Sequence, residues 1–230
     1  MKKSAIIINI ILGALLLVFT ALFIANGGLF VKSLAGVTFV AIGVVNLLYA
    51  CKDKTANKFS YIMVIGLFFA CLGDIFLEIS FIIGAALFAI GHIFFFVSYS
   101  SLIKLKLKDL IYGAGLFVAC LLFILLAPIF NFGGITMKIL CIVYAFVITF
   151  MVGKAVSNYI QDRSVQNLII LIGSILFFVS DFMLLLNLFS TIKIRILSQS
   201  LFRLLCLITY YPAEFMLAHS IAYNKKQTEK

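Results

Sequence analysis

Eight apolar stretches, each long enough to cross a lipid bilayer, take up most of this 230-residue chain. The hydrocarbon core of a bilayer is about 30 Å thick, and a helix needs about 20 residues to span it. With 65% hydrophobic residues and a mean hydropathy of +1.25, the composition is that of a membrane protein. The links between the stretches are short, which leaves no room for a soluble domain. The stretches are 5–25, 29–50, 59–79, 81–103, 109–130, 135–156, 165–188 and 198–221.

These stretches predict an all-α fold, a polytopic membrane helix bundle of about eight transmembrane helices that forms one integral membrane domain, residues 1–230. An even number of spans places both termini on one side. Thirteen of the eighteen Lys and Arg residues fall in the segments on that side, and an excess of positive charge marks the cytoplasmic side. We therefore expect a protein of the inner cell membrane with both its N- and C-termini in the cytoplasm.

The net charge of +10 does not indicate a nucleic-acid partner, because the basic residues are scattered over every inner loop. Membrane lipids are the expected surroundings, and the sequence leaves the oligomeric state open. The nucleophile-elbow, zinc-protease, phosphate-loop and dinucleotide-binding motifs are absent from the sequence, and its five cysteines form no CxxC pair. No cofactor and no metal are therefore expected.

Four carboxylates lie inside the apolar stretches: Asp74, Glu78, Asp181 and Glu214. A charged side chain at the centre of a bilayer costs about 2.5–3.5 kcal/mol even on the most lenient scale, so buried acids are kept mainly where they function or are paired. Two of them end similar segments, GLFFACLGD at Asp74 and GSILFFVSD at Asp181. For this matched pair, a functional role is favoured over a purely structural one.

The two similar segments also suggest an internal repeat. Asp74 lies in the third stretch and Asp181 in the seventh, so each is in the third helix of a four-helix half. This pattern fits two parallel repeats, 1–104 and 105–225, related by an axis along the membrane normal. Chance similarity between apolar helices is the alternative. Such an axis would place the two aspartates at one depth, facing each other near the outer side of the membrane.

Two carboxyl groups held together in an apolar site cannot both be ionised and share a proton, so an acid and a base coexist there. Such a pair suits the water-dependent cleavage of an acid-sensitive bond. The alternative is structural, with each aspartate bound to Ser, Tyr or backbone groups of its own half.

In the fourth stretch, Gly84, Gly91 and Ser98 recur every seven residues. Small residues at this spacing predict close packing against a neighbouring helix. His92 lies beside them near the middle of the membrane, where a packing role and a catalytic role are equally open.

The last stretch holds Tyr210, Tyr211, Glu214 and His219 around a proline that is expected to kink the helix. Glu214 is deep enough for a functional role, whereas His219 lies near the inner end and is expected to be solvated. Glu78 follows Asp74 by one helical turn; it either reaches water, which we favour, or adjusts Asp74 by repulsion.

Four segments resemble the YhhN-type lysoplasmalogenase family of eight-span membrane proteins. The chain departs from the family pattern where Ser33 follows Lys32 in place of the expected proline, and where Glu214 stands in place of the expected amide. Glu78 has no counterpart there. The matching segments are LGDIFL, GAALFAIGHIFFF, FFVSDFMLL and ITYYPAEFMLAHS.

The resemblance implies hydrolysis of the vinyl-ether bond of a lysophospholipid, the lysoplasmalogen, to a fatty aldehyde and a glycerophospho-base. Asp74 and Asp181 would be the catalytic acid and base, and Lys32 a contact for the phosphate. The side chains implied to orient water or substrate are His92, Glu214, Tyr210 and Tyr211.

Two other classes use the same residues. A proton-coupled transporter or lipid flippase also places acids at the interface of two repeats. A non-catalytic membrane scaffold would use the acids to hold helices together.

Overall fold

The computed structural model describes residues 3–196 and 199–224. In these residues the chain forms eight long helices joined by short links. All eight are long and apolar enough to cross a membrane, so the predicted all-α polytopic bundle is confirmed. The elements are α1 (Lys3–Asn26), α2 (Leu29–Lys52), α3 (Lys58–Leu77), α4 (Phe81–Leu102), α5 (Asp109–Leu126), α6 (Ile135–Gln161), α7 (Val165–Phe189), β1 (Arg195–Ile196), β2 (Gln199–Ser200), α8 (Leu201–Ser220) and the 3₁₀ helix η1 (Ile221–Tyr223).

Most helix ends lie within three residues of the prediction, and two differ by more. The fifth stretch was expected to run to residue 130, but α5 ends at Leu126 because Ala127 takes an extended backbone conformation. Ala127 precedes Pro128, and the residue before a proline disfavours the helical region. The sixth stretch was expected to end at residue 156, but α6 continues to Gln161. Its last turns carry polar side chains that are bound inside the protein, which an apolar count cannot detect.

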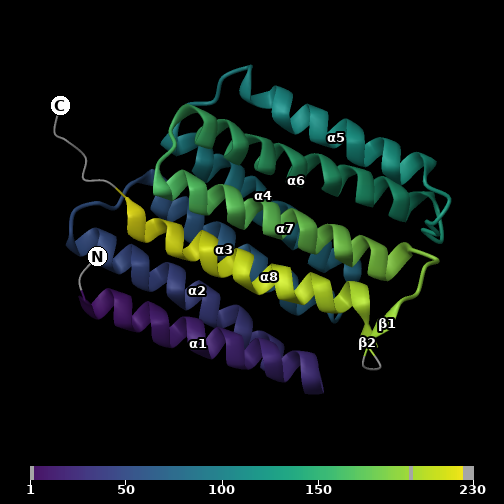
Figure 1. The fold of residues 1–230 in the computed structure, drawn as a ribbon, viewed down its shortest axis with the longest axis horizontal. Helices are drawn as coiled ribbons and strands as arrows, with labels where there is room; N and C mark the ends of the chain where they lie inside the picture. The colour runs from purple at the N-terminus through teal and green to yellow at the C-terminus, as the bar shows by residue number, and fades with distance from the viewer. Residues whose placement is uncertain (1–2, 197–198, 225–230) are drawn as a thin grey trace.

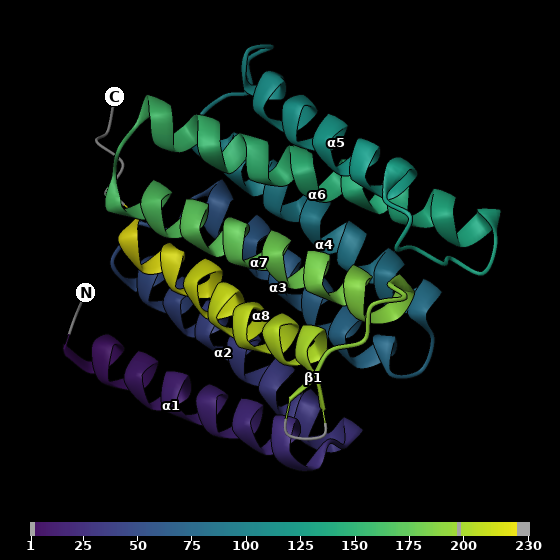
Figure 2. The same ribbon diagram turned by 45° about the vertical axis from the view of Figure 1, so that its right-hand side comes forward.

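The two halves of the chain have corresponding helix neighbours. α2 packs against α1 and α3, and α6 packs against α5 and α7, while α3–α4 and α7–α8 form the most extensive pairs. Contacts between α4 and α6 and between α2 and α8 join the halves. Figures 1 and 2 show α1 and α5 at opposite outer edges of the bundle. A two-fold repeat of 1–104 and 105–225 requires this correspondence; the repeat itself stays a prediction.

The bundle has two distinct ends. α1 begins and α8 finishes at one of them, here called the terminal end, and the β1–β2 hairpin lies at the other, the hairpin end (Figure 1). Asp74 lies three residues before the end of α3, and Asp181 lies eight residues before the end of α7. Both acids therefore lie nearer the hairpin end. Which end faces the cytoplasm stays a prediction.

The predicted small-residue stripe of the fourth stretch packs α4 against α3. A Cβ atom on Gly84 would lie 2.6 Å from the backbone nitrogen of Leu77, and one on Gly91 would lie 3.2 Å from the carbonyl oxygen of Gly66. Ser98 Oγ donates a hydrogen bond of 3.0 Å to the carbonyl oxygen of Phe59. The close approach of the two helices fixes His92, which is on α4, relative to Asp74, which is on α3.

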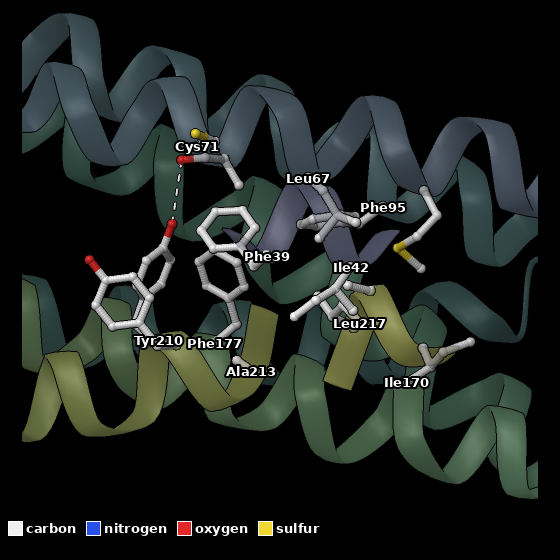
Figure 3. Packing of buried hydrophobic residues seen from close by; sticks show 14 of the residues in the cluster. Phe39, Ile42, Leu67, Cys71, Phe95, Ile170, Phe177, Tyr210, Ala213 and Leu217 are labelled. Atoms are coloured by element: carbon white, nitrogen blue, oxygen red, sulfur yellow. Dashed lines mark hydrogen bonds between the residues drawn. The ribbon is translucent and has the colours of Figure 1, made fainter. Parts of the chain in front are cut away.

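A single apolar core fills the centre of the bundle. Figure 3 shows side chains from α2, α3, α4, α7 and α8 packed together, among them Phe39, Leu67, Phe95, Phe177 and Leu217. The outer surface is also apolar, and large hydrophobic side chains from every long helix are exposed on it. Only a lipid environment makes such a surface stable. The protein is an integral membrane protein.

Candidate functional site

Asp74 is buried at the junction of α2, α3 and α8. Its side chain is almost inaccessible, with 3% of the residue exposed. Lys32 Nζ, from α2, lies 3.1 Å from its Oδ1 atom, and the Tyr211 hydroxyl, from α8, donates a hydrogen bond of 3.0 Å to Oδ2. The predicted site residues Asp74, Lys32 and Tyr211 therefore form one unit, here called the Asp74 unit.

Lys32 joins a second acid to this unit. Its ammonium group also donates to Glu78 Oε1 at 2.8 Å, and 46% of the Glu78 side chain is exposed. The expectation that Glu78 reaches water is therefore right in part, since the same carboxylate also binds a buried cation. The proposed contact of Lys32 with a phosphate does not fit this arrangement, because Lys32 is 4% exposed and already faces two carboxylates.

Asp181 forms the second unit, with partners from α4 and α6. The Tyr144 hydroxyl donates a hydrogen bond of 2.6 Å to its Oδ2 atom, and His92 Nε2 lies 3.1 Å from the same oxygen and 2.9 Å from the Tyr144 hydroxyl. Since Tyr144 gives its one proton to Asp181, the two oxygens near His92 Nε2 are both acceptors, an arrangement that suits a proton on Nε2. This set is here called the Asp181 unit.

The Asp181 unit leaves one nitrogen and one oxygen free of partners. His92 Nδ1 is buried and has no hydrogen-bond partner, while the ring packs edge-on against Phe177. Both neighbours of Asp181 bind Oδ2, so Oδ1 receives no hydrogen bond from the described residues. A packing role and a catalytic role were both open for His92. Its contact with Asp181 is the arrangement that a catalytic role requires.

The two units correspond across the two halves of the chain. α3 and α7 supply the aspartates, α2 and α6 supply Lys32 and Tyr144, and α8 and α4 supply Tyr211 and His92. Each aspartate thus has one phenol and one basic nitrogen as neighbours. No hydrogen bond joins the two carboxyl groups in the described part of the chain, so the expected direct sharing of one proton between them is not the arrangement found.

Glu214 lies between the two units. It is completely buried on α8, and neither of its carboxyl oxygens has a hydrogen bond of good geometry, although the Tyr210 side chain lies near them. It interacts electrostatically with both Asp74 and Asp181. An ionised carboxyl group without a counter-ion costs several kcal/mol in an apolar interior, so Glu214 is expected to be the neutral acid.

Tyr210, predicted to orient water or substrate, has a different partner. Its hydroxyl donates a long hydrogen bond of 3.4 Å to the backbone carbonyl of Ala70 (Figure 3). Its ring packs edge-on against Phe88 and Phe177. Tyr210 therefore belongs to the core that supports the two units.

His219 lies away from both units, near the terminal end of α8. It is partly buried, its Nδ1 atom lies 3.3 Å from Asn9 Oδ1, and its ring stacks on Phe215. The expectation of a solvated histidine is therefore wrong: α1 covers this part of α8 and provides a polar neighbour.

One further buried acid was not identified from the sequence. Asp109, at the start of α5, accepts hydrogen bonds from Lys154 Nζ at 2.7 Å and from Ser157 Oγ at 2.6 Å, and Gln161 Nε2 donates at 3.1 Å. Lys154 lies in α6 and is 1% exposed, so it is not one of the free basic residues of a cytoplasmic loop. The spacing of Lys154, Ser157 and Gln161 along one helical face is the signal that could have revealed this cluster.

An apolar pocket opens beside the Asp181 unit. It is partly open and lies between α4, α5, α6 and α7. Asp181 and Tyr144 are the polar groups in its wall, and the rest of the lining is aliphatic, aromatic or thiol. Asp181 thus lies between the buried polar interior and a space suited to an apolar ligand.

Apolar helices around buried, hydrogen-bonded acids define a polytopic membrane protein with a polar site inside its bundle. Within that class, the chain belongs to the YhhN family, whose model matches residues 35–221. The resemblance noted in the sequence is therefore confirmed. The matched region contains both aspartates, His92 and Glu214, whereas α1 and Lys32 precede it. No curated protein and no solved structure matches the chain.

Proposed function

We propose that the protein is a membrane hydrolase that cleaves the vinyl-ether bond of lysoplasmalogens and releases a fatty aldehyde and a glycerophospho-base. The observation that carries this proposal is the presence of a buried aspartate, Asp74, and a partly buried one, Asp181, in different environments and both in electrostatic contact with the buried acid Glu214, in a member of the YhhN family. Vinyl ethers are stable to base but are cleaved by acid, which is the chemistry that buried carboxyl groups can supply.

Asp181 is the proposed proton donor. Its Oδ2 atom is held by Tyr144 and His92, and its Oδ1 atom is left for the reacting proton. Asp181 also lines the apolar pocket, where an alkenyl chain can approach it. Transfer of the proton from Oδ1 to the alkene carbon produces an oxocarbenium ion and the Asp181 carboxylate.

Asp74 is the proposed stabilising carboxylate. Its ion pair with Lys32 at 3.1 Å favours the ionised form, whose negative charge stabilises the oxocarbenium ion in an interior of low dielectric constant. Water then adds to the cation and gives a proton to the Asp181 carboxylate. The resulting hemiacetal loses the glycerol hydroxyl group and becomes the aldehyde, and the acid is regenerated.

The test is aldehyde release from a 1-alkenyl lysophospholipid by the purified protein in detergent. Asp74→Asn and Asp181→Asn are each expected to reduce turnover at least about 100-fold, which is the usual contribution of a positioned acid or base. Asp162→Asn is the matched control, because Asp162 is exposed at the end of α6. Wild-type protein without aldehyde release, or an Asp181→Asn variant with full turnover, contradicts the proposal.

A transporter or flippase would give a different result in the same preparation. Reconstituted into liposomes, such a protein would move lipid or solute under a proton gradient without releasing aldehyde. If neither activity appears and both Asn variants fail to fold, the acids act as interhelical contacts.

A further inference from the structure

We infer that the apolar pocket beside Asp181 is the binding site for the single hydrocarbon chain of the substrate, with the alkene carbon that accepts the proton, the second from the ether oxygen, at Asp181. This inference rests on the proposed function, and it adds which part of the bundle recognises the lipid and which aspartate meets the chain.

The lining of the pocket fits a hydrocarbon chain. Its walls include Phe81 and Phe88 from α4, Phe123 from α5 and Phe182 and Phe189 from α7. An apolar chain has no unsatisfied polar groups to bury in such a lining, whereas a glycerophosphate headgroup would have several.

The position of α5 gives the chain a route from the membrane. α5 packs mainly against α6 and lies at the outer edge of the bundle (Figures 1 and 2). The pocket lies between α5 and the helices α4, α6 and α7, and it is partly open. A lipid chain can therefore enter sideways from the bilayer without crossing the packed core on the other side of the two units.

The polar wall favours the substrate chain over the tail of a bilayer phospholipid. Transfer of a hydrocarbon tail from the bilayer to an apolar pocket releases little free energy, because lipid tails are as apolar as leucine side chains. Asp181 and Tyr144 form the polar part of the lining, and since Tyr144 donates to Asp181, the free Oδ1 side of Asp181 is the group that can meet a polar atom at the end of a chain. The pocket therefore selects a chain that carries a polar atom at its head.

Binding can be measured without turnover through the cysteines of the wild-type protein. Cys120 lines the pocket and is partly buried, whereas Cys51 is exposed at the end of α2. A 1-alkyl lysophosphocholine, whose saturated ether cannot be hydrolysed in this way, is added before maleimide labelling, and each cysteine is followed by peptide mass spectrometry. We expect severalfold slower labelling of Cys120 and no change at Cys51. Unchanged labelling of Cys120, or equal protection by a two-chain phospholipid, overturns the inference.

A pair of neighbouring alanines on α4 provides the matched variants. Ala85 lines the pocket, whereas the adjacent Ala86 is exposed on the outside of the bundle. Ala85→Phe is expected to lower kcat/KM for an octadecenyl substrate about tenfold or more, since it fills space that the chain needs. Ala86→Phe is expected to leave kcat/KM unchanged. If Ala85→Phe does not fold, Ala145→Phe fills the pocket from α6.

The two measurements separate this inference from the proposed function. Protection of Cys120 without any aldehyde release keeps the chain-binding pocket and refutes the hydrolase. Aldehyde release with an unprotected Cys120, together with a pocket-filling variant that folds and shows normal kcat/KM, refutes the pocket and keeps the hydrolase.

Discussion

Replacement of Lys32 by methionine is expected to be among the most destabilising single changes in the bundle. Lys32 Nζ lies 3.1 Å from Asp74 Oδ1 and 2.8 Å from Glu78 Oε1. At an effective dielectric constant of about 20, two unit charges 3.1 Å apart attract by roughly 5 kcal/mol, and desolvation of both groups offsets part of this. Without Lys32, the Asp74 carboxylate keeps only Tyr211 as a hydrogen-bond donor. We therefore expect Lys32→Met to lower the free energy of unfolding by about 3–5 kcal/mol.

Asp74→Asn removes the other partner with a smaller expected effect. Lys32 still binds Glu78, which is half exposed and partly screened by solvent, and Tyr211 can still donate to the amide oxygen. A loss of about 1.5–3 kcal/mol, the usual value for a hydrogen bond to a charged group, is expected. The double variant Lys32→Met/Asp74→Asn should be more stable than Lys32→Met alone, because no buried charge is left unpaired.

The measurement is reversible unfolding in mixed micelles, with increasing amounts of sodium dodecyl sulfate, followed by circular dichroism. Lys193→Met is the control, because Lys193 is exposed near the hairpin and its removal should change the free energy of unfolding by less than about 0.5 kcal/mol. If the double variant loses the sum of the two single losses, Lys32 and Asp74 do not interact and the ion pair is not part of the folded protein.

Two further stability predictions concern the other buried acids. Asp109→Ala should lower the free energy of unfolding by about 3–5 kcal/mol, since it leaves Lys154 buried without a counter-ion. Adding Lys154→Met to this variant should restore part of the lost free energy. If the second substitution leaves the free energy of unfolding unchanged, Asp109 and Lys154 do not form this pair. Glu214→Met should raise the free energy of unfolding by about 1–3 kcal/mol, because it removes a buried carboxyl group that has no good hydrogen bond. Aldehyde release should fall in the same variant. If the variant is less stable than the wild type, Glu214 has a hydrogen-bond partner in the folded protein.

The helices could be predicted from the sequence because each apolar run has the length that a bilayer requires. The ends of α5 and α6 could not be predicted from hydropathy, since they depend on Pro128 and on the polar contacts of Lys154. A count of apolar residues sees neither local backbone preference nor a polar side chain that is satisfied inside the bundle. The outward-facing hydrophobic residues and those of the core look alike in the sequence, so their distribution over the two faces also required the structure.

The two aspartates could be identified because an acid in an apolar run is rare, but their partners could not. Tyr144 looks like any aromatic residue in a membrane span, and nothing in its neighbourhood indicates that it reaches Asp181 at 2.6 Å. Lys32 was noticed, yet its partners lie on α3, and which helices meet is decided by packing between segments far apart in the chain. The small-residue stripe on α4 was the exception, because close packing of small residues follows directly from their spacing.

The buried acids of this protein differ in how completely their charge is balanced, and this difference separates structure from chemistry. Asp109 has a buried lysine and three further donors, so its charge is fully satisfied and its role is to join α5 to α6. Asp74 has a lysine but shares it with Glu78. Asp181 has only uncharged or titratable neighbours. An acid whose charge is fully balanced holds no proton that it can give, whereas Asp181 gives one in the proposed mechanism. Substitution is therefore expected to damage mainly stability at Asp109, both stability and turnover at Asp74, and mainly turnover at Asp181, and measurement of both quantities on the three variants tests this order directly.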